Sequence, residues 1–205
     1  MISHLESFRS DRWGDVELRA LRWGEPARPV LVLLHGGGAN AHWWDHLAPR
    51  LAEHFHVVAL DFRGHGDSEY PEQLTVGGFS DDVEALLEHL GTRQVVLVGH
   101  SMGAHVALDH AARHPETRAL VLIDLSRGAG QRSRRAARLA LLLRRSYATH
   151  AEAVSRFRFL PSSDRAEEGL RRSIAEHSVR QQVDGRYGFK FDARWFGLAS
   201  KPAPD

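Results

Sequence analysis

The stretch Gly99–Gly103 constrains the fold of this chain more than any other. It reads Gly-His-Ser-Met-Gly, follows the β-branched, apolar run Val95–Val98, and precedes a helix with a face of small residues. A serine between a buried strand and a helix must take a strained backbone, and flanking glycines let neighbouring backbone approach it. The pattern predicts Ser101 as a nucleophile. A glycine-rich turn with no chemistry is the alternative.

A second glycine-rich segment follows another buried strand. Val30–Leu34 is continuously apolar, as a central parallel strand requires, and runs directly into His35-Gly36-Gly37-Gly38. Glycines at the carboxyl end of a strand leave backbone N–H groups open to a ligand, as an oxyanion hole needs. A flexible loop explains the same residues equally well.

The remaining pattern predicts alternating strands and helices. We expect an amphipathic strand near the sheet edge at 16–23, buried strands at 57–60 and 119–123, and helices at 41–54 and 79–90. The strand at 57–60 leads into a glycine-punctuated turn, Asp61–Ser68. His65 and Asp67 are candidates for catalysis there, but their place early in the chain favours a structural role. This order is typical of a doubly wound, mostly parallel α/β sheet.

Taken together, His35–Gly37, Asp61–Ser68 and Gly99–Gly103 resemble the α/β-hydrolase superfamily over residues 15–125. The resemblance implies that Ser101 is the nucleophile and that the N–H groups of Gly37 and Met102 are the oxyanion donors. Relatives that open epoxides or displace halide resemble one another in using a carboxylate at the nucleophile position. A serine there favours acyl chemistry on esters, thioesters or related carbonyls, as in carboxylesterases. We expect the substrate pocket to be lined by His35, Gly36, Trp43 and His100.

The chain divides into three predicted segments. Residues 1–125 form the hydrolase core, 126–190 an all-helical cap similar to that of family esterases, and 191–205 the start of a return to the core. Helices are expected at 132–145, 151–159 and 166–179. The cap segment holds 15 Lys and Arg against 6 Asp and Glu, although the whole chain has a net charge of +1. Because it carries no nucleic-acid-binding motif, we interpret its arginines as solvated helix faces.

No histidine occupies the position expected for the catalytic base. In the family the order is Ser, then an acid, then a His after the eighth strand. The chain is expected to end before the seventh strand, so that the last two core strands are absent and the chain looks truncated. Asp124 is a candidate acid at the end of the strand at 119–123, or a structural residue. The later histidines lie in helices or the cap, where His177 is the candidate substitute base; they are His105, His110, His114, His150 and His177.

Two consequences are expected from the missing residues. Loss of the His from a catalytic triad of Ser, acid and His lowers kcat on the order of a millionfold, so the chain as written should be nearly inactive. The strand at 119–123 becomes an uncovered sheet edge, which favours aggregation. The alternative to a serine hydrolase is therefore a non-catalytic small-molecule-binding protein or an inactive fragment. Hydrolysis of a C–C bond beside a carbonyl and cofactor-free perhydrolysis remain open within enzymes.

Composition excludes several other classes. With no Cys, the chain has no disulfide, thiol nucleophile or thiolate metal site. We expect no metal, no cofactor and no nucleic-acid partner, and a small ester-like molecule as the substrate. No segment reaches ~18 uninterrupted apolar residues and the N-terminus lacks the apolar core of a signal peptide, so no membrane association and a cytoplasmic location are expected. The sequence leaves the oligomeric state open.

Overall fold

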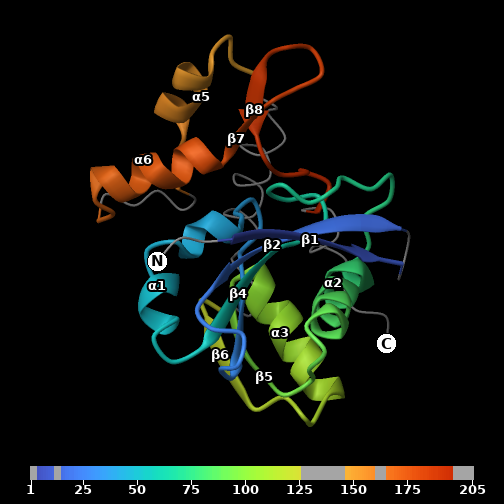
Figure 1. Cartoon of the computed structure of the whole chain (residues 1–205). Helices are drawn as coiled ribbons and strands as arrows, with labels where there is room; N and C mark the ends of the chain where they lie inside the picture. The colour runs from blue at the N-terminus through green and yellow to red at the C-terminus, as the bar shows by residue number, and fades with distance from the viewer. Residues whose placement is uncertain (1–3, 12–14, 126–145, 160–164, 196–205) are drawn as a thin grey trace.

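A computed structural model describes residues 4–11, 15–125, 146–159 and 165–195 (Figure 1). The helix predicted at 132–145, and residues 196–205 of the predicted return segment, lie outside the described residues. Within the described part, no helix combines the length and the apolar character needed to cross a bilayer.

The core is a six-stranded, mostly parallel sheet. In spatial order the strands are β1, β2, β4, β3, β5 and β6. Strands β3 to β6 pair in parallel, whereas β1 pairs antiparallel with β2, and β2 antiparallel with β4. The bounds in chain order are β1 His4–Ser10, β2 Val16–Trp23, β3 Val30–Leu34, β4 His56–Asp61, β5 Val95–His100 and β6 Ala119–Ile123. The fold confirms the prediction of a doubly wound α/β sheet.

Helices cover both faces of this sheet (Figure 1). On one face, α2 (Val76–His89) and α3 (Met102–Arg113) pack against the apolar side chains of the sheet through Phe79, Leu86 and Val106, among others. The 3-10 helix η1 (Ala41–Trp44) and the short α1 (Ala48–Leu51) bury Ala41, Trp44 and Ala48 on the other face. Buried on both faces, β3 and β4 carry the continuous apolar runs that the sequence shows.

The helix predicted at 41–54 is two shorter helices. Asn40 caps η1 by accepting a hydrogen bond from the backbone N–H of His42, and α1 has Pro49 in its first turn. Proline lacks a backbone N–H and is tolerated only in the first turn of a helix, so Pro49 starts a new helix and cannot continue the previous one.

The region above the core is not all-helical as predicted. Its described part contains α5 (His150–Arg156), α6 (Glu168–His177) and an antiparallel hairpin of β7 (Val179–Gln181) and β8 (Tyr187–Phe189). Between the two strands, Gly185 has a φ of +77°, a conformation that favours glycine in a tight turn. The β-forming residues Val179, Tyr187 and Phe189 therefore form a hairpin after α6. We call residues 146–159 and 165–190 the cap.

Several contacts hold the cap to the core. Asn40 Nδ2 donates to Ser178 Oγ at 3.0 Å, Lys190 Nζ pairs with Asp67 at 2.7 Å, and the backbone N–H of Gly66 donates to the carbonyl of Lys190. The cap therefore contacts the loops at the carboxyl ends of β3 and β4 (Figure 1).

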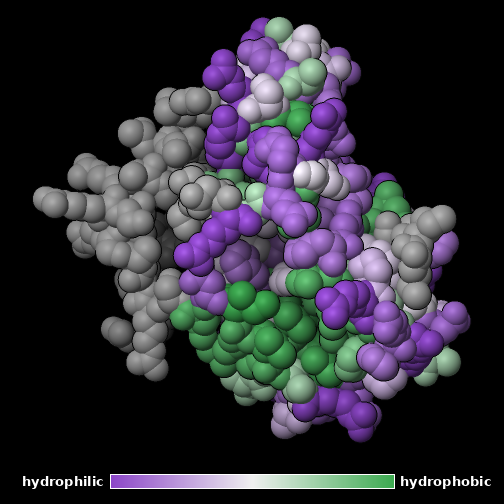
Figure 2. All heavy atoms as spheres, turned by 90° about the vertical axis from the view of Figure 1, so that its left-hand side faces the viewer, coloured by the Kyte–Doolittle hydropathy of each residue, from purple (hydrophilic) through white to green (hydrophobic). Residues whose placement is uncertain are grey.

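Strand β6 lies at an edge of the sheet, as the sequence analysis expected. Its side chains are exposed or half-buried, and Val121 and Ile123 remain 46% and 40% exposed. Figure 2 shows a broad hydrophobic surface below the cap on this side of the molecule. That this surface promotes aggregation stays a prediction.

Candidate active site

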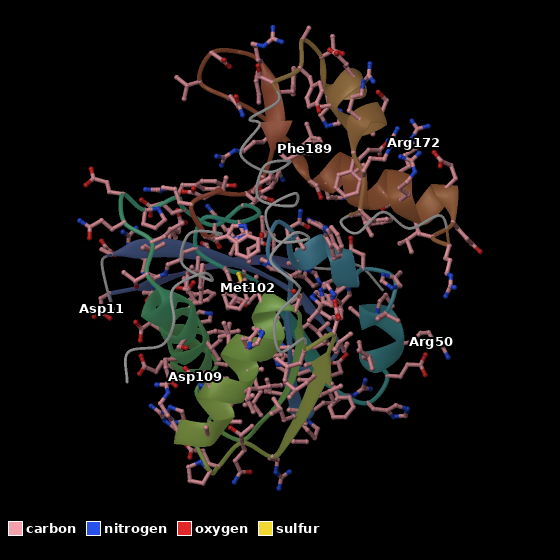
Figure 3. The ribbon with its side chains drawn as sticks, turned by 180° about the vertical axis from the view of Figure 1, so that it is seen from behind. Asp11, Arg50, Met102, Asp109, Arg172 and Phe189 are labelled. Atoms are coloured by element: carbon pink, nitrogen blue, oxygen red, sulfur yellow. The ribbon has the colours of Figure 1, made fainter. Side chains whose placement is uncertain are left out.

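Ser101 stands on a strained turn between β5 and α3. Its φ is +50° and its ψ is −108°, and α3 begins at the next residue, Met102. Positive φ costs energy in a residue with a Cβ, and it persists here because the strand and the helix fix both sides. The Ser101 N–H donates to the carbonyl of Ile123 at 2.9 Å, which anchors the turn to β6. Met102, labelled in Figure 3, lies at the end of α3 nearest the cap.

The glycines flanking this turn have no space for a side chain. A Cβ on Gly99 would lie 2.3 Å from the carbonyl oxygen of Gly103, and a Cβ on Gly103 would lie 2.4 Å from that of Leu34. Both obstacles are backbone atoms of the packed sheet and helix. The pattern G-x-S-x-G is therefore required here by close packing, as predicted from the sequence.

We expect Gly103→Ala to lower the free energy of unfolding by about 3 kcal/mol, because the new Cβ overlaps the Leu34 and His35 carbonyls. The matched control is Gly77→Ala in α2, where a Cβ meets nothing within 4 Å. That control should raise the free energy of unfolding by about 0.5 kcal/mol through the lower entropy of the unfolded chain. Urea unfolding of both variants measures the difference. Equal effects would show that Gly103 is not close-packed.

The glycine loop after β3 lies against Ser101. A Cβ on Gly36 would lie 2.7 Å from His100 Nδ1 and 3.4 Å from Ser101 Cβ. The loop closes with a hydrogen bond from the Ala39 N–H to the Gly36 carbonyl at 3.1 Å. This placement brings the backbone after His35 beside Ser101, where the sequence predicted the oxyanion donors Gly37 and Met102.

His35 supports this loop and does not line a pocket surface as predicted. The imidazole is 1% exposed, its Nδ1 donates to the Gly36 carbonyl at 2.7 Å, and its Nε2 accepts from the N–H of Phe62 at 3.2 Å. Burial lowers the pKa of His35 well below its usual value, so the ring is neutral. A buried imidazole with both nitrogens in use ties the loop after β3 to the turn after β4.

The turn Asp61–Ser68 is a structural support. The Asp61 carboxylate accepts hydrogen bonds from the N–H groups of Ala41 and Asp67, and burial raises the pKa of Asp61 to about 6. His65 is fully buried, and its Nδ1 donates to the Arg63 carbonyl at 3.2 Å. Asp67 pairs with Lys190 of the cap. Neither His65 nor Asp67 hydrogen-bonds to Ser101, in agreement with the structural role favoured from the sequence.

His65 should make the protein less stable in mild acid. Burial lowers the pKa of His65 to about 4, whereas an unfolded histidine titrates near 6.5. Between these values the unfolded state binds a proton that native His65 does not, so stability falls as the pH falls through this range. From pH 7 to pH 5 this contribution is about 2 kcal/mol.

Urea unfolding of wild type and His65→Asn at pH 7 and pH 5 measures this contribution. The variant should lose about 2 kcal/mol less than wild type. Burial raises the pKa values of Asp61 and Asp82 to about 6, which acts in the opposite direction. Those two groups are present in both proteins and cancel in the comparison. The same pH dependence in both proteins would contradict a neutral, buried His65.

Two further predicted residues lie near the cap and the nucleophile. Trp43 packs edge-to-face against Phe157 and Phe159 of the cap, with ring centroids 6.2 and 5.2 Å apart. Trp43 therefore lies where the core meets the cap. The His100 ring lies against Gly36, and burial lowers its pKa while the nearby Asp124 carboxylate acts in the opposite direction.

Asp124 resembles Ser101 in its backbone. It is exposed at the carboxyl end of β6, and its φ is +52°. Ser101 and Asp124 are the two non-glycine residues with positive φ among the described residues. Such outliers gather at functional sites, which keeps Asp124 as the candidate acid. In the described structure, however, no histidine donates a hydrogen bond to its carboxylate.

Comparisons with known proteins show the family to which the chain belongs. Residues 29–183 match the sequence profile of the family described as alpha/beta hydrolase fold. The chain belongs to this family. Esterase Rv0045c of Mycobacterium tuberculosis is 32% identical over 193 residues, which cover 88% of this chain and 62% of that protein. Epoxide hydrolase A of the same organism is 37% identical over 110 residues, which cover 52% of this chain.

Solved structures show the same fold. The crystal structure of E-2-(acetamidomethylene)succinate hydrolase has a TM-score of 0.76 and 25% identity, over 95% of this chain and 72% of that one. A putative hydrolase from Rickettsia typhi has a TM-score of 0.86 at 16% identity, over 95% of this chain and 74% of that one, which shows the fold alone. The matched region spans only about a third of the first curated relatives, 34% for Epoxide hydrolase A.

One residue of this α/β hydrolase joins the site without having been predicted. The indole of Trp195 packs on the Cα of Gly37, because a Cβ on Gly37 would lie 2.1 Å from two of its ring carbons. Trp195 is 9% exposed and belongs to the main core cluster. From the sequence, Trp195 was placed only within the segment 191–205, which was expected to start the return to the core. The indole fixes the loop that carries the predicted oxyanion donor.

The described part of this α/β hydrolase holds the candidate nucleophile Ser101 and the residues that support its turn, but no base hydrogen-bonded to it. No described histidine hydrogen-bonds to Ser101. The ring of His177, the predicted substitute base, stacks on His42 at 4.0 Å between centroids, and its Nδ1 donates to the Ser173 carbonyl at 2.8 Å. A surface groove bordered by Arg28, His56 and Arg118 lies at the amino ends of the strands, away from the nucleophile.

Proposed function

We propose that this α/β hydrolase is a serine hydrolase that cleaves an ester or a related carbonyl compound through an acyl-enzyme on Ser101. The strained backbone of Ser101 carries the proposal, because a turn with a φ of +50° holds Oγ out of both the strand and the helix. Similarity to Esterase Rv0045c supports ester chemistry. Epoxide hydrolase A and 2-(acetamidomethylene)succinate hydrolase are similar over about half of this chain and show how varied the family's reactions are.

The proposed mechanism has two steps. Ser101 Oγ attacks the carbonyl carbon while a base takes its proton, and the oxyanion receives hydrogen bonds from the N–H groups of Gly37 and Met102. The intermediate collapses, the alcohol leaves with a proton, and an acyl-serine remains. Water then attacks the acyl-serine by the same route and releases the acid. Each oxyanion donor contributes ~3 kcal/mol to stabilising the transition state.

The base and the acid belong to the proposal as well. By resemblance to the family, the mechanism requires a histidine base, with Asp124 as the candidate acid. The activity is therefore tested on the full product of the reading frame that encodes this sequence. The small ester-like substrate is the only partner that the proposal requires.

Pre-steady-state hydrolysis of p-nitrophenyl acetate, butyrate and octanoate tests the proposal. We expect a burst of about one equivalent of p-nitrophenol from the full product, because acylation precedes water attack. The chain of residues 1–205 should release p-nitrophenol far more slowly, since no histidine in its described part hydrogen-bonds to Ser101. The absence of a burst and of turnover in the full product would contradict an acyl-enzyme.

A non-catalytic small-molecule-binding protein is the second candidate. It is favoured by one observation, that no described base hydrogen-bonds to Ser101. Binding of a non-hydrolysable ester analogue, measured by calorimetry, separates the two. A binding protein keeps its affinity in Ser101→Ala and releases no product, whereas the proposed hydrolase turns its ester over and loses turnover in that variant.

A further inference from the structure

A second cluster of chemically active side chains lies between α2 and α3, apart from the nucleophile. Glu84 on α2 faces His110 and His114 at the end of α3. Its Oε1 lies 2.9 Å from His110 Nδ1 and 2.7 Å from His114 Nε2. Asp109, the residue before His110, is labelled in Figure 3. Its carboxylate accepts a hydrogen bond from Ser80 of α2. The two helices are thus joined beside the cluster.

Two atoms of the cluster are buried without a hydrogen bond. Among the described residues, Glu84 Oε1 and His110 Nδ1 have no hydrogen-bond partner, although they lie close together. The residues Glu84 and His110 are only 4% and 1% exposed. Buried polar atoms are normally satisfied, because an unsatisfied one destabilises the fold. Glu84 Oε1 and His110 Nδ1 lie within ion-pair distance but lack the geometry of a hydrogen bond, and a cation bound by both atoms would satisfy them.

We propose that Glu84, His110 and His114 form a binding site for a divalent metal ion of the zinc class. Two imidazoles and a carboxylate are ligands that Zn²⁺ prefers, and His110 and His114 stand four residues apart, the first in the last turn of α3 and the second directly after it. The site is independent of the proposed hydrolase function, and it departs from the sequence-based expectation of no metal.

The surroundings orient the ligands as metal sites do. Arg93 Nη1 donates to Glu84 Oε2 at 3.2 Å, which leaves Oε1 as the ligand atom. His114 Nδ1 lies 3.4 Å from the Glu116 carboxylate, and a proton held there leaves the Nε2 lone pair available. Carboxylate partners of this kind fix the tautomer of a metal-binding histidine.

Binding requires a small rearrangement of one ring. The two imidazoles stack with centroids 4.3 Å apart and planes at 17°, and an ion must lie in the plane of each ligating ring. Ligand atoms around tetrahedral zinc stand ~3.4 Å apart, so Glu84 Oε1 must separate from the two nitrogens by roughly 0.5 to 0.7 Å. His114 is the residue after the last turn of α3, and its side chain is 21% exposed, so it has room to turn.

Titration with CoCl₂, followed by the visible absorption of four-coordinate Co²⁺, tests the site on the metal-free chain. We expect one tight equivalent in wild type, lost in His114→Ala. His105→Ala on the exposed side of α3 is the matched control and should keep it. His177→Ala disrupts the cluster of His42, Asp45 and His177, which also brings three possible ligands together, and should keep it as well.

Glu116→Gln keeps the proposal testable if His114→Ala does not fold. It alters a half-buried partner of His114 and should weaken Co²⁺ binding by about 10- to 100-fold. ZnCl₂ should also raise the melting temperature of wild type, because it binds the native state, and should not raise that of His114→Ala. The absence of a tight equivalent in wild type, or an equal equivalent in His114→Ala, would overturn the proposal. Loss of the tight Co²⁺ equivalent in His177→Ala, with no loss in His114→Ala, would overturn it as well.

Discussion

Asp82→Ala is expected to lower the free energy of unfolding by about 3–5 kcal/mol. The Asp82 carboxylate is completely buried on α2 and binds Arg63, which is 1% exposed. It accepts hydrogen bonds from the Arg63 backbone N–H at 2.9 Å and from Nε at 2.8 Å, and it pairs with Nη2 at 2.7 Å. Alanine removes the negative charge from beside a guanidinium that cannot reach bulk water in the native fold.

Asp82→Ala lowers the free energy of unfolding because the Arg63 charge stays buried without its carboxylate. The ion pair itself need not contribute a large net stabilisation. Burial raises the pKa of Asp82 to about 6 even though Arg63 lowers it, so desolvation of the carboxylate outweighs the attraction. The double variant Arg63→Met, Asp82→Leu removes both charges and should recover most of the lost stability.

Urea unfolding at pH 7 measures both variants. Glu176→Ala is the control, because it breaks an ion pair with Arg172 whose side chains are 71% and 45% exposed. Exposed pairs contribute 0–1 kcal/mol, so this variant should unfold almost as wild type does. If Asp82→Ala is no less stable than Glu176→Ala, Arg63 and Asp82 do not hold the turn after β4 in place.

Ser101→Ala is expected to abolish ester hydrolysis by the full product, with a loss on the order of a millionfold in kcat. Without Oγ no acyl-enzyme can form, and only binding and the oxyanion donors remain to assist direct water attack. The variant should fold normally, because the Ser101 side chain makes no capping hydrogen bond to α3. Hydrolysis of p-nitrophenyl butyrate measures the loss, and equal melting temperatures confirm the fold.

Ser155→Ala is the matched control for this variant. Ser155 is exposed on α5, and its Oγ donates to the Glu152 carbonyl. Its replacement therefore removes a serine hydroxyl on a different element from the Ser101 turn. Its rate should equal that of wild type. A Ser101→Ala rate within tenfold of wild type would show that the nucleophile lies elsewhere.

The buried part of the fold was predictable because its sequence signal is local. β3 and β4 are continuously apolar, and the glycines of Gly99–Gly103 report the close approach of backbone around Ser101. The edge strand β1 gives no such signal, since only Phe8 and Ser10 among its seven residues are buried. The hairpin of β7 and β8 was missed because strands of three residues are too short to show an alternation of apolar and polar residues.

The site was predictable only as far as its motifs extend. Ser101 and the loop after His35 follow from residues adjacent in sequence. The inward-facing ring of His35 and the indole of Trp195 on Gly37 depend on contacts between distant parts of the chain. The same holds for Glu84, which meets His110 and His114 only when α2 packs on α3. Tertiary packing therefore supplied what periodicity and motifs could not.

Covalent labelling with a fluorophosphonate tests the central claim most directly. The full product of the reading frame is incubated with the probe, and the intact mass and the modified peptide are read by mass spectrometry. We predict one adduct per chain, located on Ser101, present in Ser155→Ala and absent in Ser101→Ala. No adduct on the folded full product, or an adduct on another residue that persists in Ser101→Ala, would contradict the assignment of Ser101 as the nucleophile.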